Sequence, residues 1–442
     1  MHYTKNEIIR LVEEEDVEFI RLQFTDICGN MKNMAITSSQ LEKALDNQCM
    51  FDGSSIEGFA REEESDMYLY PDLDTFEIFP WRPQQGKVAR LICDVYKADR
   101  TPFEGDPRYV LKKVLKQAED MGYTFDVGSE CEFFLFHTDE DGFPTTMTHE
   151  KAGYFDVGPV DLGENARRDM VMNLEEMGFE IESSYHEKAA AQHEIDFRYD
   201  NALRAADNIM TFKLTVKSIA RRHGLHATFM PKPKNGVNGS GMHLHLSLSR
   251  EGVNLFDDTE GQYGLSQEAY YFIAGIMEHM KGITLIANPT VNSYKRLVPG
   301  YEAPVYIGWS GGRRTPLIRI PASRGQKARV ELRSPDPVAN PYLLLAACLA
   351  AGLEGIQKQM KVPKEMGKEI YQMGKEEAEE KGIECLPANL QEAIAEFEKD
   401  SFLHDVLGQH VSSKYVKHKK AEWDSYHNQI TEWEINEYLY RL

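Results

Sequence analysis

Residues 129–136 have the sequence SECEFFLF, a pattern typical of a β-strand with two unlike faces. Alternate side chains of a strand point to opposite sides, so Glu130 and Glu132 share one face, about 7 Å apart. An apolar set that includes Cys131 and Phe133 lines the other face. The segment therefore predicts a sheet with one face for a hydrophobic core and one face that carries carboxylates.

Three other segments repeat this alternation, with charged or imidazole side chains opposite an apolar face. Any one such face could be an ordinary solvated sheet surface. Together they consist mainly of Glu, His and Arg, the side chains that hold metal ions and phosphates, and converging carboxylates need cations to balance their charge. Oxygen ligands with one imidazole suit Mg²⁺ or Mn²⁺. The polar faces comprise Glu194, Asp196 and Arg198 in residues 193–198, His243, His245 and Ser247 in residues 241–248, and Arg329, Glu331 and Arg333 in residues 328–334.

The composition is that of an ordered globular protein, since hydrophobic residues make up 42% of the 442 and charged residues 27%. This length predicts two or three domains. The net charge of −21 argues against nucleic acid as a partner, because binding phosphates needs a basic surface. Separated cysteines without a CxxC pair indicate reduced thiols. With no visible signal peptide and no apolar run long enough for a bilayer, we expect a cytoplasmic protein without a membrane partner.

A domain boundary is predicted within residues 101–107, TPFEGDP, which interrupt the strand and helix patterns. Asp106 is a good N-cap and Pro107 a good first residue for the helix that follows. The chain then divides into a small mixed α/β domain, residues 1–104, and a larger domain, residues 105–442.

The usual phosphate-binding loops are missing. The sequence has no GxxxxGK[ST], and the glycines of residues 236–241 do not fit the dinucleotide pattern. A nucleotide would have to be held through metal ions and arginines. Candidates are Arg313, Arg314 and Arg319, each of which could also be an ordinary surface arginine.

Five collinear segments resemble glutamine synthetase, specifically the type I enzyme of bacteria and archaea. The likeness runs in order along nearly the whole chain. It implies an α+β fold, with an N-terminal β-grasp-like domain and a C-terminal catalytic domain built on a curved, funnel-shaped antiparallel sheet flanked by helices. The segments are MFDGSSI at 50–56, ECE at 130–132, NGSGMH at 238–243, NPTVNSYKRL at 288–297 and RVELR at 329–333.

The resemblance implies ATP-dependent ligation of ammonia to L-glutamate, giving glutamine, ADP and phosphate through γ-glutamyl phosphate, as in nitrogen assimilation. It also implies two or more Mg²⁺ or Mn²⁺ ions per site. By position, it assigns metal binding to Glu132, Glu187 and Glu194 and to Glu130, His243 and Glu331, glutamate binding to Asn238, Gly239, Arg296, Glu302, Arg314 and Arg333, and ATP binding to Glu182, His245, Ser247, Arg314, Arg319 and Arg329.

Three residues match catalytic positions of the family. Asp52 matches the carboxylate that takes a proton from ammonium, and Glu302 matches a flap residue that completes the ammonium site and keeps water from the acyl phosphate. Arg314 would stabilise charge on the transferred phosphoryl group. Because Asp52 and the metal ligands lie in different domains, which the family joins between neighbouring subunits, we expect a dodecamer of two hexameric rings.

The regulatory subgroup is predicted from Arg61, which matches a position that confers glutamine feedback inhibition in the alpha subgroup, the one that is not adenylylated. Some Gram-positive relatives also bind transcription regulators, so a nitrogen-regulatory protein is a candidate partner. Cys131, Asn235 and Arg313 depart from residues common in relatives, which leaves loop rigidity and nucleotide fit open.

Two other functions stay open on sequence. A ligase of the same superfamily would join glutamate to an organic amine, although a closed, charged pocket with Asp52 and Glu302 favours a small cation. A noncatalytic relative would have lost metal ligands, whereas all six expected ligands are present.

Overall fold

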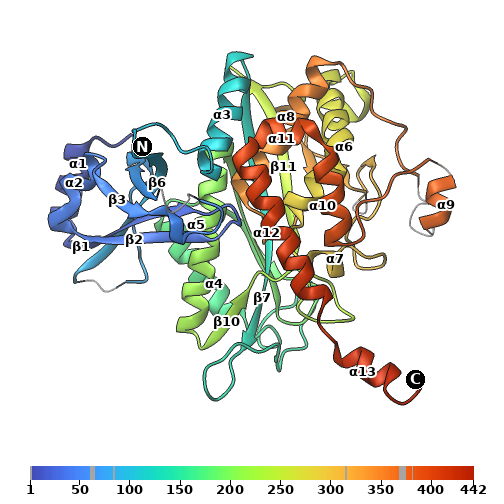
Figure 1. Cartoon of the computed structure of the whole chain (residues 1–442), viewed down its shortest axis with the longest axis horizontal. Helices are drawn as coiled ribbons and strands as arrows, with labels where there is room; N and C mark the ends of the chain where they lie inside the picture. Colours follow the sequence, from blue (N-terminus) through green and yellow to red (C-terminus); the bar gives the residue numbers. More distant parts are fainter. Residues whose placement is uncertain (1, 60–64, 83–84, 314–315, 368–374, 381) are drawn as a thin grey trace.

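The computed structural model describes residues 2–59, 65–82, 85–313, 316–367, 375–380 and 382–442. Its N-terminal part holds a six-stranded sheet of order β2-β1-β6-β4-β3, with β5 beside β6 (Figure 1). Strands β1 and β6 run parallel, and the other pairs are antiparallel. The elements of this part are α1 (Lys5–Glu14), β1 (Val17–Thr25), β2 (Met31–Thr37), α2 (Leu41–Leu45), β3 (Cys49–Asp52), β4 (Asp66–Pro71), β5 (Glu77–Ile78) and β6 (Lys87–Lys97).

The larger part holds a nine-stranded sheet of order β13-β14-β15-β11-β7-β9-β8, with β10 beside β7 and β12 beside β11. Its pairs are antiparallel except for β13 and β14. The strands are β7 (Thr124–His137), β8 (Ile181–His186), β9 (Gln192–Asn201), β10 (Leu225–Thr228), β11 (Met242–Arg250), β12 (Val253–Asn254), β13 (Trp309–Gly311), β14 (Ile318–Ile320) and β15 (Val330–Leu332).

Helices gather on one side of this sheet and run on to the C-terminus (Figure 1). Among the described residues, none of them is both long and apolar enough to cross a membrane. They are α3 (Pro107–Asp120), α4 (Glu164–Glu176), α5 (Ala202–Arg222), α6 (Gln267–Ala287), α7 (Ser293–Arg296), α8 (Pro341–Gln357), α9 (Lys375–Glu380), α10 (Leu390–Lys399), α11 (Ser401–Leu407), α12 (Gln409–His427) and α13 (Glu432–Tyr438).

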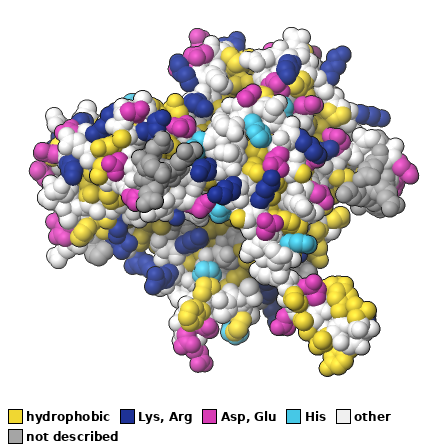
Figure 2. Space-filling model, viewed as in Figure 1, with side chains coloured by type: hydrophobic (Ala, Val, Ile, Leu, Met, Phe, Trp, Pro, Cys, Tyr) yellow, Lys and Arg dark blue, Asp and Glu magenta, His cyan; other side chains and the backbone are white. Residues whose placement is uncertain are grey.

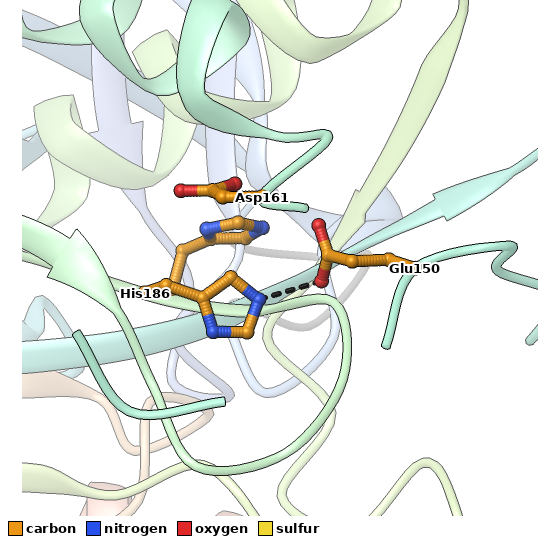
Figure 3. Close-up of side chains that lie close together, drawn as sticks. Glu150, Asp161 and His186 are labelled. Atoms are coloured by element: carbon orange, nitrogen blue, oxygen red, sulfur yellow. Dashed lines mark hydrogen bonds and ion pairs between the residues drawn. The ribbon is translucent and has the colours of Figure 1, made fainter. Parts of the chain in front are cut away.

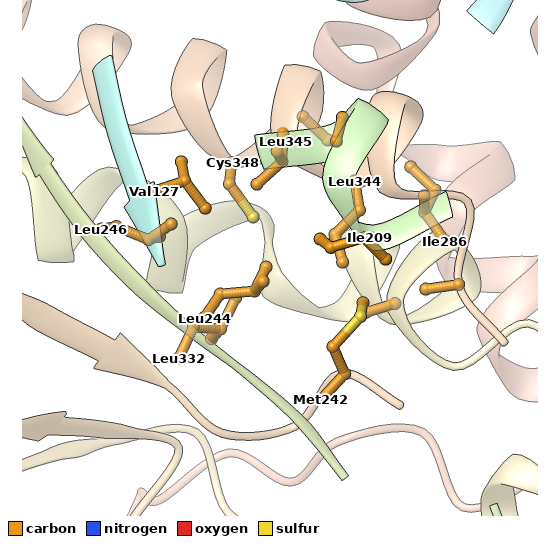
Figure 4. Packing of buried hydrophobic residues seen from close by; sticks show 14 of the residues in the cluster. Val127, Ile209, Met242, Leu244, Leu246, Ile286, Leu332, Leu344, Leu345 and Cys348 are labelled. Carbon is orange, nitrogen blue, oxygen red and sulfur yellow. The ribbon is translucent and has the colours of Figure 1, made fainter. Parts of the chain in front are cut away.

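The core lies between the apolar face of the larger sheet and helices α5, α6 and α8. Figure 4 shows Val127 and Leu244 from the strands packed with Ile209 of α5 and Leu344 of α8. The apolar run in residues 343–353 forms the middle of α8 and is buried, as its length and composition predict. Because the helices cover only this face, the opposite face of the strands is left for polar side chains.

A buried ion-pair network joins the two parts of the chain. Arg108 of α3 donates to Asp72 at 2.7 Å, to Asp94 at 2.7 Å and to Asp207 of α5 at 2.9 and 3.0 Å. Only 3% of the Arg108 side chain is exposed, so these carboxylates replace its hydration. The predicted cap is confirmed, since the Asp106 side chain accepts from the Arg108 N–H at the start of α3.

Candidate active site

The polar face of the larger sheet gathers side chains from neighbouring strands. His243 of β11 lies opposite Glu130 of β7, and Glu194 of β9 lies opposite Glu132. The alternation that put these residues on one face of each strand therefore puts them on one face of the sheet. Strand β15 is shorter than the expected strand 328–334, because only its three central residues keep strand geometry.

We call Glu132, Glu187 and Glu194 the carboxylate trio. Their oxygens can all lie within 4.8 Å of one another. Glu132 Oε2 accepts from the Gly241 N–H at 2.8 Å and from Gln192 Nε2 at 3.0 Å. Glu194 is 2% exposed, and its Oε1 has no hydrogen-bond partner among the described residues. An orphaned carboxylate oxygen beside two further carboxylates fits a bound cation.

The trio resists ionisation without such a cation. Burial raises the pKa of Glu132 to about 8, and the charge of Glu187 adds to the rise. Burial and the charge of Glu132 raise the pKa of Glu194 well above its ordinary value, and burial also raises the pKa of Glu187. Three neighbouring acids, of which Glu194 is buried and Glu132 and Glu187 are half-buried, therefore favour either protons or a divalent ion.

We call Glu130, His243 and Glu331 the histidine cluster, whose ligand atoms also lie within 4.8 Å of one another. His243 Nδ1 is 3.1 Å from Glu130 Oε2 and 3.8 Å from Glu331 Oε1. His245 Nε2 lies 2.7 Å from Glu130, while its Nδ1 accepts from Arg329 at 3.1 Å. That acceptor role makes Nε2–H the donor to Glu130.

The histidine cluster is neutralised by the protein itself. Glu331 is fully buried and forms ion pairs with Arg319 and Arg333. Burial alone would raise the pKa of Glu331, but Arg333 and the histidines lower it overall. Burial is likewise outweighed at Glu130, whose pKa is lowered by hydrogen bonds from His243 and His245. These carboxylates stay ionised and ready to bind a cation.

Two hollows meet at Glu130, which lines both. The first also contains the carboxylate trio, and every described residue that is expected to bind glutamate lines it. The second contains four of the residues expected to bind ATP. Lining the first hollow are Asn238, Gly239, Arg296, Glu302 and Arg333; lining the second are Glu182, His245, Ser247 and Arg329.

Residues 104–438 match the glutamine synthetase catalytic domain, and residues 16–98 match the glutamine synthetase β-grasp domain. The chain belongs to the glutamine synthetase family. The predicted α+β fold, a β-grasp domain followed by a catalytic domain with a curved sheet and helices, is thereby confirmed.

Relatives within the glutamine synthetase family are similar over their whole length. The glutamine synthetase of Clostridium saccharobutylicum is 62% identical over 437 residues, which cover 99% of each chain. That of Staphylococcus aureus (strain MW2) is 57% identical over 438 residues, covering 99% of this chain and 98% of the relative.

Solved structures share this fold. A structure described as "GmaS/ADP complex-Conformation 1" has a TM-score of 0.89 at 34% identity and covers 99% of this chain and all of its own. The glutamine synthetase of Plasmodium falciparum has a TM-score of 0.88 at 25% identity and covers 99% of both chains.

Some expected site residues lie elsewhere. Arg319 lines the first hollow, beside Glu331, and not the second. Asp52 lines neither hollow and lies exposed at the end of β3, where hydrogen bonds from Ser54 lower the pKa of its carboxylate. Arg61 and Arg314 lie outside the described residues.

Sequence reasoning missed Gln192, whose Nε2 donates to Glu132 and, at 3.0 Å, to the Gly239 carbonyl. It stands two residues before Glu194, so the same strand alternation could have placed it on this face. Lys188 was also missed: it forms an ion pair with Glu302 at the mouth of the first hollow. No periodicity marks Lys188, because it lies in a turn.

The three residues that depart from relatives leave the two clusters intact. Cys131 is fully buried on the core face of β7, and burial raises the pKa of its thiol to about 12. Asn235 is exposed. Arg313 donates to the Met366 carbonyl at 3.3 Å and lines neither hollow.

A further buried group adjoins the carboxylate trio along the chain, since His186 precedes Glu187 and His193 precedes Glu194; Figure 3 shows Glu150, Asp161 and His186 of this group. It resembles a metal site, but Arg167 donates to Asp161 at 2.8 Å and lies 2.8 Å from His193 Nδ1. Glu150 pairs with His186 at 2.5 Å. The group's carboxylates are already hydrogen-bonded and, unlike the histidine cluster, its residues line neither hollow, so we interpret this group as a structural support. Its potential ligands are Glu150, Asp161, His186 and His193.

This support holds the turn that carries one member of the trio. Glu150 accepts from His186 and from the Ala191 N–H, on either side of the turn, and from the Leu162 N–H at 2.9 Å. His186 directly precedes Glu187 in the chain. A buried, fully bonded carboxylate therefore sets the position of a neighbouring ligand.

Proposed function

We propose that this chain catalyses the ATP-dependent ligation of ammonia to L-glutamate, forming glutamine, ADP and phosphate, in nitrogen assimilation. The observation that carries the proposal is the pair of ligand clusters at the meeting point of two hollows, in a chain 62% identical to a glutamine synthetase. One hollow can hold an amino acid and the other a nucleotide, with the carboxylate trio in the first and Glu130 of the histidine cluster lining both.

The first hollow is the proposed glutamate site. Arg296 and Arg333 are 3% and 6% exposed, and they supply positive charge to a carboxylate substrate. Arg333 Nε is buried without a hydrogen-bond partner among the described residues, so it has a donor to spare. Asn238 and Gly239 border the same hollow and would hold the amino acid end through polar contacts.

The second hollow is the proposed ATP site, formed by Glu182, His245, Ser247 and Arg329. A structure of the same fold described as an ADP complex supports nucleotide binding here. Arg319, which pairs with Glu331 at the histidine cluster, would face the phosphates, and we assign the same role to Arg314 on sequence alone.

We propose Mg²⁺ or Mn²⁺ as the cofactors, one held by the carboxylate trio and one by the histidine cluster. Carboxylate oxygens with a single imidazole are the ligands that these hard ions prefer. When bound, such ions neutralise phosphate charge and orient both substrates. The protein contributes the rigid strands that hold the ligands in place.

The reaction follows in two steps. A γ-carboxylate oxygen of glutamate attacks the γ-phosphorus of ATP, and the bond to the bridging oxygen breaks to release ADP. Ammonia then attacks the carbonyl carbon of γ-glutamyl phosphate, and phosphate leaves. Ammonium must first lose a proton, a role that we assign to Asp52, while Glu302 would bind the cation and shield the acyl phosphate from water.

Asp52 can serve that role only from a neighbouring subunit, because within one chain it lines neither hollow. The C-terminal segment supports self-association, because Trp433, Tyr438 and Leu439 are exposed. Figure 2 shows hydrophobic side chains on the part that projects from the body of the molecule where Figure 1 places α13. We propose a homo-oligomer, specifically a dodecamer of two hexameric rings.

For regulation, we propose the alpha subgroup, with glutamine feedback through Arg61 and a nitrogen-regulatory protein as a further partner. Arg61→Ala should abolish inhibition by glutamine with the catalytic rate unchanged. Inhibition that persists in the variant would contradict the regulatory role of Arg61.

We also propose that the protein is located in the cytoplasm and that its two domains are residues 1–104 and 105–442.

The proposed reaction is tested by measuring glutamine and ADP with glutamate, ATP, ammonium and Mg²⁺ or Mn²⁺. We expect both products to depend on ammonium. Methylammonium and polyamines serve as alternative acceptors, which test the organic-amine ligase. An assembled, metal-loaded oligomer that forms no glutamine would overturn the proposal.

A further inference from the structure

A lysine ammonium group already sits on the flap carboxylate. Lys188, in the turn between β8 and β9, forms an ion pair through Nζ with Oε1 of Glu302. The backbone N–H of Lys188 donates to Glu187 Oε2 at 2.9 Å. One residue therefore touches both the carboxylate trio and the flap at the mouth of the first hollow.

The flap that carries Glu302 is held by specific contacts. Glu302 has a φ of +59°, a conformation that side chains adopt at a cost, so its position depends on its partners. The Tyr301 ring lies 3.7 Å from Lys232 Nζ, and Asn238 Nδ2 is 3.5 Å from the other oxygen of Glu302. Among the described residues, Lys188 supplies the ion pair to this carboxylate.

The head group of Lys188 has the chemistry of the substrate that Glu302 is proposed to bind. A lysine side chain ends in a compact primary ammonium with one positive charge and three N–H donors. Ammonium carries the same charge and one more donor. Both bind a carboxylate through the same charge-assisted hydrogen bonds.

We propose that Lys188 is a tethered competitor of ammonium: its side chain occupies Glu302, and ammonium enters by displacing it. Lys188 thereby sets the apparent affinity of the enzyme for its nitrogen substrate. This inference rests on the proposed function, and it adds a specificity-determining residue to the same site.

The expected effect is modest, since the pair is accessible to water. The side chains of Lys188 and Glu302 are 44% and 56% exposed, and exposed ion pairs are weak and screened by salt. Such a coupling corresponds to about a two- to fivefold change in an apparent binding constant. That cost leaves ammonium able to displace the lysine.

The test compares Lys188→Met, which keeps length and removes charge, with Lys188→Arg, which keeps the charge. In the wild-type oligomer, we expect the KM for ammonium to exceed that of Lys188→Met by about two- to fivefold. The KM for ATP should be equal, and Lys188→Arg should resemble the wild type. The gap should narrow as salt rises, since screening weakens the competitor but not a packing role.

Lys281→Met is the matched control, because Lys281 forms an exposed ion pair with Glu384 at 2.9 Å away from both hollows. It should leave the KM for ammonium unchanged. If the wild type is active and Lys188→Met leaves the KM for ammonium unchanged or raises it, Lys188 does not compete with ammonium. Release of ADP without glutamine by Lys188→Met would also overturn the proposal, because it would show that Lys188 instead holds the flap in place against water. A wild type that forms no glutamine overturns the proposed function and this inference with it.

Discussion

The carboxylate trio and the histidine cluster lie side by side on one sheet face, yet they balance their charge in opposite ways. In the histidine cluster, Arg319 and Arg333 pair with the buried Glu331, so its carboxylates stay ionised. In the trio, burial raises the pKa of every member, and the charge of another trio member adds to the rise at Glu132 and at Glu194. One oxygen of Glu194 has no hydrogen-bond partner among the described residues.

This difference in charge balance indicates that the trio, and not the histidine cluster, depends on a metal ion to balance its charge. The histidine cluster is preorganised by fixed cations of the protein and can receive an ion without gaining or losing protons. The trio exchanges protons for the ion, so its affinity depends on pH. The protein's own cations therefore balance the charge of the proposed phosphoryl-transfer site, whereas the proposed glutamate site reaches charge balance when a metal ion binds.

One substitution in each cluster tests the difference between the two clusters most directly. Glu130→Gln and Glu132→Gln should each lower kcat/KM by about 10³-fold, because each removes a charge that holds an ion. Glu130→Gln should chiefly raise the KM for ATP and slow phosphoryl transfer. Glu132→Gln should chiefly raise the KM values for glutamate and ammonium. Steady-state kinetics decide, and identical defects in the two variants would contradict the division.

The structural support formed by Glu150 and His186 should contribute to the free energy of unfolding. Glu150→Ala leaves the buried His186 without its carboxylate and should lower the free energy of unfolding by about 3 kcal/mol. Denaturant titration measures the change. Glu176→Ala, at an exposed position of α4, is the control and should shift stability by less than about 0.5 kcal/mol. A loss no larger than the control would show that the pair does not support the turn.

Metal binding should stabilise the fold and release protons from the trio. At about 100 times Kd, Mg²⁺ or Mn²⁺ should add about 2.7 kcal/mol, and thermal melts with and without EDTA measure it. The folded, metal-free pKa of Glu132 is raised from 4.5 to about 8, so the metal-free protein loses stability as pH rises across that range.

The ion requires the carboxylate form, so metal affinity should rise with pH up to about 8. Calorimetry in buffers of different ionisation enthalpy measures the released protons. Glu132→Gln should remove most of the release, whereas Glu130→Gln should keep it. Equal proton release from both variants would remove the distinction between the clusters.

The smallest effect concerns a histidine far from both clusters. Burial alone would lower the pKa of His279, but hydrogen bonds to Asp400 at 2.8 Å and to Glu354 at 2.7 Å raise it above 6.5. Its stabilisation is complete below 6.5 and is lost as pH rises through the folded-state pKa. His279→Gln should therefore cost less than about 1 kcal/mol at low pH and progressively less at high pH. A melting-temperature difference that grows with pH would contradict this.

Strand alternation was enough to predict much of the site. Glu130 and Glu132 on one face, with Cys131 on the other, follow from the period of two, and the structure has this arrangement. The members of the carboxylate trio and of the histidine cluster were predicted from the family resemblance, and the structure brings the members of each group together. Gln192 and Lys188 were missed, one for want of a reason to extend the strand and the other because a turn has no periodicity.

By itself, the sequence determined the faces of the strands, the buried helix in residues 343–353 and the cap at Asp106, because each depends on neighbours along the chain. Only the tertiary structure decided that Arg333 neutralises Glu331, that Glu194 keeps an oxygen unpaired within the described part of the chain, and that Lys188 reaches Glu302. Charge balance in a buried site depends on which strands and turns become neighbours in space, and a single chain segment carries no record of those partners.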